Sequence, residues 1–437
     1  MYFWVAEKVV KSPELLVGLL RCSNAKITFE VPYTDRLTGK KYIGDHVFVA
    51  DGETHSLIPE PGQGTFALDN VKIGIGFHWQ RDCRQRFNGA LEILPLSTGE
   101  MWIINRIDIE EYLKSVIASE MNLAAPEAFL EAHAIISRSW AYAMLQKHDI
   151  APDEEEDCQT ETEDKIVRWH DRLDHTLFDL CADDHCQRYQ GIPETNAERA
   201  NLAVENTRGI VLTYQGELCD ARFSKCCGGA FEEFETCWED KSHPYLTSGR
   251  DDSDVENLPD LTQESNAEDW MMSSPKAFCN TKDTKALATV LKDYDLETTD
   301  FYRWKQDYTQ QELCDLIGRY APRPLGRILN LEPVDRGPSG RIKLLKITGT
   351  EATVTIGKEL EIRRWLALTH LYSSAFIVER REIGEDGVPG AFRLHGAGWG
   401  HGVGLCQIGA AMMSLQGHNA EEILLHYYRG AKLEKQW

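Results

Sequence analysis

The sequence predicts an α+β protein with a β-rich N-terminal region and a mixed core in which helices line a cleft. Three observations support this. Short runs rich in β-branched and aromatic residues recur over residues 26–105, divided by Gly, Asp and Pro. From Ile109 onward, apolar residues recur instead with the period of a helix. Strand-like runs return over residues 326–398, before two short helical patterns near the C-terminal end.

Five N-terminal runs predict strands, and we therefore predict a β-rich region of residues 1–104 followed by a second region of residues 105–437. The runs are KITFEVPYTD, YIGDHVFVAD, VKIGIGFHW, GALEILPL and EMWIINRI, beginning at Lys26, Tyr42, Val71, Gly89 and Glu100.

Two long helices follow these strands. Asp108, with Glu111 three places on, resembles a capping box that opens the first helix. Pro126 can occupy the first position of the second helix, which we expect to run to about Lys147. The apolar stripe of the first helix comprises Ile109, Tyr112, Leu113, Val116 and Ile117.

The rest of the chain alternates polar insertions with further strands. Residues 151–165 form an acidic run that predicts a solvated loop, and residues 252–300, rich in Asp, Ser and Thr, predict a second insertion. The predicted strands lie in GRILNLEPVDR, GRIKLLKITGT, ATVTIG, SAFIVERREIG and AFRLHGAG. Of the two final helices, the first runs from near Leu405 to Gly417, and the second is capped by Asn419 with Glu422 three places on.

The composition and net charge of the chain exclude some classes of function. The chain has 437 residues, 42% of them hydrophobic, and a net charge of −23, so it is globular and repels nucleic acid phosphates and anionic lipids. No run of 18 apolar residues occurs, so no transmembrane helix is expected. The N-terminal segment is not a clear signal peptide, because Glu7 and Glu14 interrupt its apolar residues. Twelve cysteines spread over the chain do not define the compartment.

Glu120 is the first candidate for chemistry. It stands at the end of the predicted first helix, in VIASEMNLAAP, among small and apolar neighbours. A buried carboxylic acid keeps its proton more readily, because burial disfavours the charged form, and this suits a general acid. The alternative is a carboxylate that only caps the following turn.

The second candidate is the segment HGAGWGHGVGLCQ, in which glycines alternate from Gly396 to Gly404. In an extended strand, this alternation would place all the glycines on one face and Trp399 and His401 on the other. An aromatic ring beside open backbone suits a sugar chain. The alternatives are a tight packing seam between sheet and helix, and a zinc hydrolase site built from His395, His401 and Cys406.

Four metal-ligating side chains lie within twelve residues in HTLFDLCADDHC. His175, Cys181, His185 and Cys186 have the ligand types of a structural zinc, although the spacing is not that of a zinc finger. A disulfide or free thiols are the alternatives.

A second cysteine-rich run, KCCGGAFEEFETCW, contains Cys226, Cys227 and Cys237. A cysteine nucleophile here would need a histidine base, for which His243 is the local candidate.

Taken together, these segments resemble the SpoIID/LytB family, which includes the sporulation stage II protein D and the amidase enhancers. The matching pieces occur in the family's order and span roughly residues 105–433. They are EEYLKSVIASEM, EAFLEAHAIISRSWAYA, DHCQRYQG, RFSKCCGGAFEEF with HPYL, and GAGWGHGVGLCQIGAAMMSLQGHNAEEILLHYYRGAKL. The sequence departs from the family at Cys227, where many members have Ser, and in lacking the membrane anchor of the sporulation type.

The resemblance implies a peptidoglycan lytic transglycosylase, which cleaves the bond between N-acetylmuramic acid and N-acetylglucosamine without water and leaves a 1,6-anhydro ring. It implies Glu120 as the catalytic acid and then base, with no cofactor needed for the chemistry. It also implies one structural zinc held by His and Cys residues, which the 175–186 cluster could supply. Arg138 matches the family's helix arginine, expected to bind substrate or steady the Glu120 region. His401 and Gln407, with Trp399, are expected to bind sugar.

The expected partners are peptidoglycan glycan strands, which sporulation members of the family cut after the stem peptides have been removed, and a cell-wall amidase. The expected location is outside the cytoplasm, because the substrate is there. A competing hypothesis is a glycan-binding protein that enhances an amidase without cutting glycan.

Overall fold

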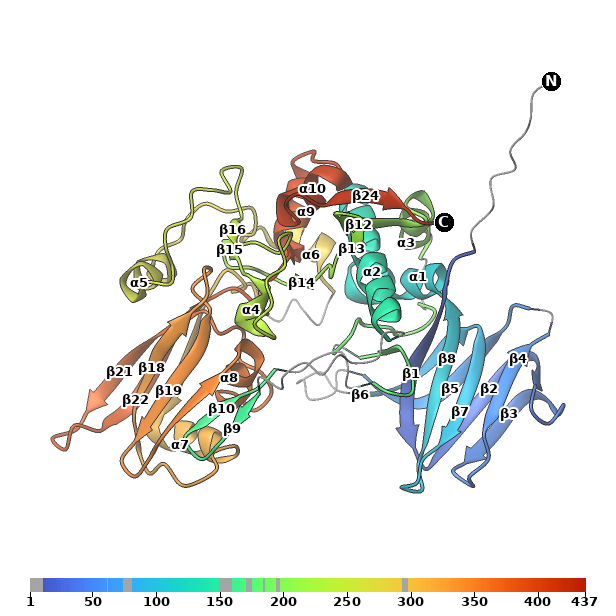
Figure 1. Ribbon diagram of the computed structural model, residues 1–437, viewed down its shortest axis with the longest axis horizontal. Helices are drawn as coiled ribbons and strands as arrows, with labels where there is room; N and C mark the ends of the chain where they lie inside the picture. The colour runs from blue at the N-terminus through green and yellow to red at the C-terminus, as the bar shows by residue number, and fades with distance from the viewer. Residues whose placement is uncertain are drawn as a thin grey trace. The chain divides into compact units, whose positions relative to one another are not determined.

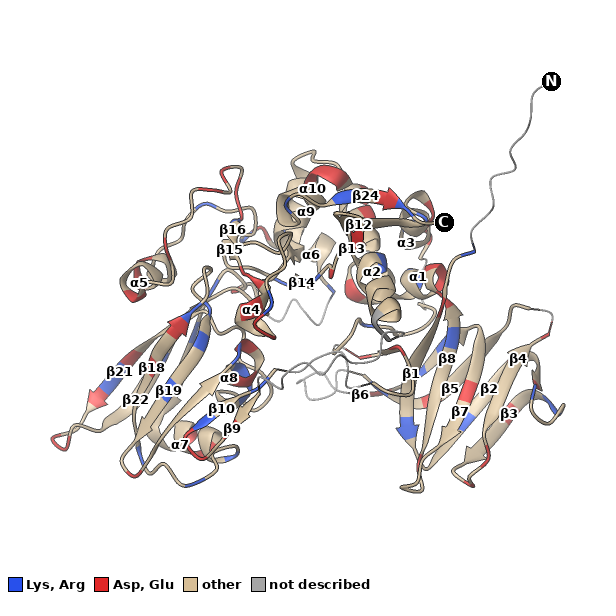
Figure 2. Cartoon of the chain, in the orientation of Figure 1, with Lys and Arg blue, Asp and Glu red and all other residues tan. Residues whose placement is uncertain are grey.

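A computed structural model describes residues 11–60, 62–73, 81–148, 159–169, 175–183, 185–193, 197–292 and 298–437 (Figure 1). The chain divides into two compact units. Unit 1 comprises residues 1–151, 172–220 and 432–437, and unit 2 comprises residues 152–171 and 221–431. Basic and acidic residues are interspersed along the strands and loops of both units (Figure 2).

Unit 1 is built on a nine-stranded sheet within its described residues. The order is β11-β1-β8-β7-β4-β2-β5-β6, with β3 paired to β2. Alternating side chains of these strands, among them Phe29, Tyr33, Phe66 and Phe87, fill the interior. The strands are β1 (Glu14–Cys22), β2 (Asn24–Asp35), β3 (Lys41–Val49), β4 (His55–Pro59), β5 (Thr65–Ile73), β6 (Arg81–Asn88), β7 (Ala90–Pro95), β8 (Met101–Asp108) and β11 (Leu180–Cys181).

Helices α1 (Ile109–Glu120), α2 (Glu127–His148) and α3 (Glu198–Asn206) pack together next to this sheet. As predicted, Asp108 is the N-cap of α1, although its side chain accepts from the Glu110 N–H and not from that of Glu111. The predicted apolar stripe of α1 is buried. A small sheet of β12 (Ile210–Tyr214), β13 (Glu217–Leu218) and the C-terminal β24 (Lys432–Lys435) completes the unit.

Unit 2 contains two larger sheets. One has the order β18-β19-β20-β10-β9 and consists of β9 (Thr160–Glu161), β10 (Lys165–Val167), β18 (Ile328–Arg336), β19 (Ile342–Gly349) and β20 (Thr353–Gly357). The other pairs β22 (Pro389–Ala397) with β17 (Arg303–Thr309) and β21 (Phe376–Ile383). Trp304, Trp365, Phe376 and Phe392 are among the buried residues of the core that these sheets share.

The remaining elements of unit 2 are short. They are β14 (Phe223–Ser224), β15 (Ala230–Phe231), α4 (Phe234–Cys237), β16 (Gly249–Arg250), α5 (Glu264–Met272), α6 (Thr284–Val290), α7 (Gln310–Gly318), α8 (Glu359–Trp365), β23 (Leu405–Cys406), α9 (Gln407–Leu415) and α10 (Ala420–Tyr427). The capping box predicted for α10 is present, with Asn419 and Glu422 bonded reciprocally.

The α+β class is confirmed, but the chain does not divide at residues 104 and 105. Helix α1 continues directly from β8, and β11 joins the same sheet from beyond the helices, so both predicted regions contribute to unit 1. Of the predicted acidic loop of residues 151–165, residues 151–158 lie outside the described residues, whereas Thr160–Glu161 forms a strand and a second strand, Lys165–Val167, begins at the end of the loop. The predicted insertion of residues 252–300 contains α5 and α6, with Leu261 and Trp270 buried. Within the described residues, no helix has both the length and the apolar composition needed to cross a bilayer.

Candidate active site and metal centre

Glu120 is the last residue of α1 and is only 7% exposed. Its Oε1 accepts a hydrogen bond from the backbone N–H of Arg188 at 3.1 Å. The neighbouring Ser119 Oγ accepts from the Gln190 N–H at 3.3 Å. The segment around residues 188–190 therefore runs along the end of α1 and fixes one oxygen of the Glu120 carboxyl.

This segment is itself anchored on both sides. The Tyr189 hydroxyl donates to Asn105 Oδ1 on β8 at 2.7 Å, and its ring stacks on Tyr112 of α1 with centroids 4.9 Å apart. The Gln187 amide donates to the carbonyl of Ser137 on α2 at 3.4 Å. Sequence reasoning identified the DHCQRYQG motif but not that its backbone would hold Glu120.

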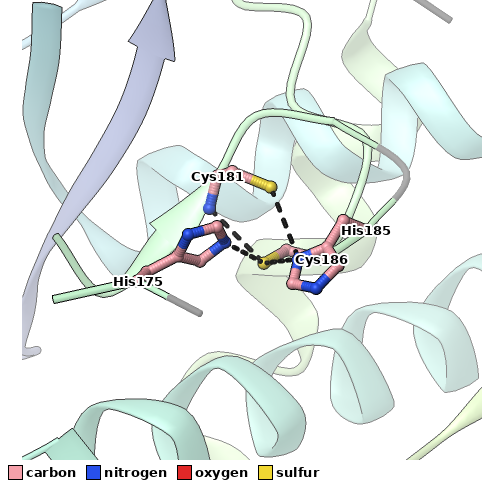
Figure 3. A group of neighbouring side chains, drawn as sticks. All are labelled: His175, Cys181, His185 and Cys186. Atoms are coloured by element: carbon pink, nitrogen blue, oxygen red, sulfur yellow. Dashed lines mark hydrogen bonds between the residues drawn. The ribbon is translucent and has the colours of Figure 1, made fainter. Parts of the chain in front are cut away.

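The four predicted zinc ligands come together just before this segment. One ligand atom from each of His175, Cys181, His185 and Cys186 lies within 4.8 Å of the other three (Figure 3). Cys186 Sγ is 3.5 Å from His175 Nε2 and 3.5 Å from His185 Nδ1, while Cys181 Sγ is 3.8 Å from His185 Nδ1. In a tetrahedral zinc site, sulfur and nitrogen ligands lie about 3.5 Å apart.

The electrostatics of this cluster also suit a cation. Hydrogen bonds from Cys186, and then from His175 and His185, lower the pKa of the Cys181 thiol to about 2 against the effect of burial. The thiolate is the form of cysteine that binds metal. Cys181 is paired with Gly18 in the sheet and Cys186 is two residues from Arg188, so the cluster joins the sheet to the segment that holds Glu120.

Arg138 takes a different position from the one expected of a substrate-binding group. It is fully buried, and its guanidinium forms two bonds to the Glu110 carboxylate at 3.0 and 2.7 Å. It also donates to Thr207 Oγ1 and to the carbonyls of Val204 and Ile210. The structure therefore places Arg138 in an interior ion pair that joins α1, α2 and α3, because its donors are used within the protein.

The glycine segment is not an extended strand, which corrects the prediction. Strand β22 ends at Ala397, and Gly398, Gly400, Gly402 and Gly404 all have φ between 68° and 91°. The alternation therefore reflects alternate left-handed residues, a conformation that glycine adopts without strain. A Cβ on Gly402 would lie 2.3 Å from Arg341 Cζ.

Arg341 explains why this loop is so tight. It is fully buried, and it donates to the carbonyl of Gly400 at 3.0 Å and to that of Cys227 at 3.3 Å. The packing-seam interpretation fits this geometry better than an open glycan-binding face, because a buried guanidinium fills the space beside the glycines.

The predicted sugar-binding residues belong to unit 2, whereas Glu120 belongs to unit 1. Trp399 is half-buried, with its ring centroid 5.1 Å from that of Phe301 and 4.7 Å from that of Tyr372. Burial, with the positive charges of Arg222, Arg341 and Arg363, lowers the pKa of His401 to about 3, so its imidazole stays neutral. Gln407 is buried at the start of α9.

The contacts of the described residues do not support two of the alternatives that the sequence left open, a zinc hydrolase site and a cysteine nucleophile. Within the described residues, His395, His401 and Cys406 do not form a metal-ligand cluster, and His395 Nε2 lies 3.0 Å from a carboxylate oxygen of Glu379. The Cys227 thiol lies 3.5 Å from that of Cys279, and the Cys237 thiol donates to the His401 carbonyl. These contacts favour neither a cysteine nucleophile with His243 as its base nor a zinc hydrolase site at these positions.

Glu232 is a carboxyl that the sequence analysis missed. It is fully buried in unit 2, and burial raises its pKa to about 7, although hydrogen bonds from Ser339 and the Glu233 N–H oppose this. The Ser339 hydroxyl donates to it at 2.7 Å. It lies between β15 and α4 beside a second glutamate, and the local sequence AFEEF does not indicate which of the two carboxyls is buried.

Comparison with known proteins agrees with this description of unit 1. Residues 97–214 match the model of the stage II sporulation protein family, and residues 232–404 match a domain of unknown function. The chain is 25% identical over 239 residues to the amidase enhancer of Bacillus subtilis, covering 53% of this chain and 32% of that protein. It is 23% identical over 332 residues to the stage II sporulation protein D of Bacillus amyloliquefaciens, covering 76% of each.

A third relative is an uncharacterized protein of Brachyspira hyodysenteriae, 23% identical over 418 residues, which are 92% of this chain and 90% of that protein. The chain thus spans about a third of the amidase enhancer but most of the other two. The part of the chain that holds Glu120, Arg138 and the 175–186 cluster is the part that the sporulation model matches. The match of residues 97–214 to the stage II sporulation protein family, with relatives named stage II sporulation protein D and amidase enhancer, supports the resemblance of this part of the chain to the SpoIID/LytB family.

Proposed function

We propose that the protein acts on the bacterial cell wall as a lytic transglycosylase that cuts peptidoglycan glycan strands. The observation that carries the proposal is the placement of Glu120: a buried carboxyl at the end of α1 with one oxygen fixed by the Arg188 N–H. A held carboxyl of this kind is what general acid catalysis requires.

In the proposed reaction, Glu120 donates its proton to the glycosidic oxygen as the bond to C1 of N-acetylmuramic acid breaks. The resulting carboxylate then takes the proton from the C6 hydroxyl of the same sugar, whose oxygen attacks C1 and closes the 1,6-anhydro ring. The substrate supplies the nucleophile and no water is consumed. One carboxyl therefore serves where other glycosidases use two.

The hydrogen bond from the Arg188 N–H to Oε1 suits this double role. It orients the carboxyl, and we propose that Oε2 is the oxygen that exchanges the proton with substrate. A pocket in the same unit is lined in part by Lys114 and Ser115 of α1 and by Tyr189 and Gly191. The Lys114 ammonium group and the Glu111 carboxylate, which also lines the pocket, suit sugar hydroxyls and acetamides, and we propose the pocket as part of the glycan-binding surface.

The 175–186 cluster is proposed to hold one structural zinc. Four protein ligands would close the coordination shell, so the metal would organise the fold and leave no position for substrate. The chemistry would remain with Glu120. We expect the protein to act outside the cytoplasm, where glycan strands are found.

The experiment that tests the proposal is digestion of purified glycan strands, with and without stem peptides, followed by mass spectrometry. A lytic transglycosylase releases fragments with anhydro-muramic ends, each lighter by one water than the product of a hydrolase. Fragments with ordinary reducing ends would contradict the mechanism, and comparison of the two substrates shows whether stem peptides must be absent.

A second candidate function is favoured by the match to the protein named amidase enhancer. In that case the protein would bind glycan and stimulate a cell-wall amidase without cutting. The digest would then release no glycan fragments, whereas adding the protein to a cell-wall amidase would accelerate release of stem peptides.

A further inference from the structure

A second cluster of metal-ligating side chains is buried in unit 2. It shares no residue with the 175–186 cluster, which belongs to unit 1. One ligand atom from each of Cys227, Asp251, Cys279 and Cys406 lies within 4.8 Å of the other three. All four residues are at most 2% exposed. Unlike the first cluster, it joins positions that are far apart in the chain, just after β14, at the end of β16, before α6 and at the start of α9.

The atoms are close enough for one ion and too close for a larger cluster. The Sγ atoms of Cys227 and Cys279 are 3.5 Å apart. Two sulfurs bound to one zinc at about 2.3 Å in tetrahedral geometry lie about 3.8 Å apart. A fourth thiol, that of Cys226, hydrogen-bonds with the thiols of Cys279 and Cys406 and so borders the same centre.

The surroundings hold these ligands as a metal site would. Cys406 Sγ accepts hydrogen bonds from the Cys227 N–H at 3.2 Å and from the Gly409 N–H at 3.4 Å. Gly409 lies in the N-terminal turn of α9. Backbone N–H groups and a helix N-terminus both favour thiolate over thiol. Asp251 is oriented as ligands usually are, by hydrogen bonds to its oxygens from the Cys279 N–H at 2.9 Å and the Tyr427 hydroxyl at 2.7 Å.

Two arginines, the buried Arg341 and the half-buried Arg303, balance the negative charge that such a site would carry. Zinc with three thiolates and one carboxylate has a net charge of −2. Arg341 donates to the carbonyl of Cys227 at 3.3 Å, and Arg303 donates to that of Gly228 at 2.9 Å. Their guanidinium groups lie beside the loop that supplies the first ligand.

We infer that Cys227, Cys279, Cys406 and Asp251 bind one zinc ion. Soft thiolates in a tetrahedral set select zinc among the common divalent metals. The site is closed, with four protein ligands and no exposure to solvent, so its part is structural. It would tie the Gly-Gly turn after Cys227 and the start of α9 to the segment of residues 251–279.

The test is zinc analysis of the full-length protein, purified without chelator, in a Cys181→Ser/Cys186→Ser background that removes the first cluster. We expect one zinc per chain to remain, and to fall below about a tenth of that when Cys227→Ser and Cys279→Ser are added. Cys237→Ser is the matched control: Cys237 is also buried in unit 2, but its thiol donates to the His401 carbonyl, so the zinc should stay.

Cobalt substitution in the same Cys181→Ser/Cys186→Ser background keeps the test open if the four-cysteine variant fails to fold. The expected result is a thiolate-to-cobalt charge-transfer band together with intense visible bands of a tetrahedral ion. A background protein that is folded but free of zinc, and that gives no such bands, would overturn the inference. So would a disulfide between Cys227 and Cys279, found by mass spectrometry of the protein without added oxidant.

Discussion

At the scale of single residues, the contacts of the buried carboxyl groups differ between those that stabilise the fold and the one proposed to act in catalysis. Glu110, Glu120 and Glu232 are all buried, but they are held differently. Glu110 faces a buried guanidinium, Glu232 faces hydroxyl and backbone donors, and Glu120 receives one backbone N–H. All three lie in segments that resemble the family, but only Glu120 of these three stands at the end of a helix, at the position that the resemblance implies for the catalytic acid, and that is why it is proposed as the acid.

Glu232 makes a prediction about pH. Because its pKa is raised to about 7 in the folded protein, its contribution to stability is fully present below the unfolded value of about 4.3 and is lost as the pH rises through 7. The free energy of unfolding should therefore fall across this window by on the order of 3 kcal/mol from this residue. Urea unfolding at several pH values should show a smaller fall in Glu232→Gln.

The control for that experiment is Glu235→Gln, at a half-buried position one helical turn on. It should keep the wild-type pH dependence. An unchanged slope in Glu232→Gln would show that Glu232 is not the group responsible.

Arg138 gives a second prediction at this scale. Arg138→Gln leaves the Glu110 carboxylate without its guanidinium partner, and breaking a buried ion pair costs about 3–5 kcal/mol. The variant should unfold at a much lower urea concentration than wild type. Adding Glu110→Gln should recover part of the loss, because no unpaired charge then remains. A variant of wild-type stability whose KM for glycan rises would restore the substrate-binding role predicted from sequence.

At the scale of elements, the glycine loop shows how space and backbone conformation combine. Gly402 and Gly417 both have positive φ, 76° and 97°, but a Cβ on Gly417 would meet nothing within 4 Å. Gly417→Ala should therefore cost only the left-handed penalty, about 1–2 kcal/mol. Gly402→Ala should cost about 1–3 kcal/mol more, because its Cβ would overlap the buried Arg341. Equal losses in thermal or urea unfolding would contradict the packing-seam interpretation.

The 175–186 cluster makes a prediction about metal. Cys181→Ser/Cys186→Ser should lower the zinc content by one ion per chain and reduce stability more than it reduces turnover. Some loss of activity is expected as well, because the segment that follows Cys186 holds Glu120. Cys22→Ser, at a half-buried cysteine of β1 in the same unit, should change neither. Unchanged zinc content in the double variant, with a Cys181–Cys186 disulfide in wild type, would contradict the assignment.

The sequence predicted a feature well where the residues that produce it lie close together in the chain. The stripe of α1, the cap of α10 and the grouping of the His and Cys side chains between His175 and Cys186 have their causes within short windows, and the sequence predicted each of them; the zinc itself stays a prediction. The cluster around Cys227 was not, because Asp251, Cys279 and Cys406 come together only through the tertiary fold. The alternating glycines were misassigned to a strand, because alternation is equally typical of repeated left-handed residues.

At the scale of the whole molecule, the division into units is what sequence reasoning could not supply. Strand β1 was hidden in an N-terminal segment examined only as a signal peptide, yet it pairs with β8 and β11 and so unites the N-terminal strands with the helices. Likewise, β24 adds the C-terminal residues to unit 1 by pairing with β12. Pairings between strands so distant in sequence leave no local pattern.

The central claim is that Glu120 alone performs the proton transfers, and Glu120→Gln tests it most directly. Gln keeps the shape and an oxygen for the Arg188 N–H but cannot donate the proton. General acid–base groups contribute about 10²- to 10⁴-fold, and a residue that serves both steps should lie near the upper end. Glu100→Gln is the control, at a partly exposed carboxyl of the same unit that is paired with Arg21 and does not line the proposed glycan-binding pocket.

The measurement is the rate at which each protein releases anhydro-muramic ends from peptide-free glycan strands, with circular dichroism to verify folding. We expect Glu120→Gln to remain folded and bind glycan while its rate falls by about 10⁴-fold, and Glu100→Gln to stay near wild type. A folded Glu120→Gln protein that releases these ends at close to the wild-type rate would contradict the account.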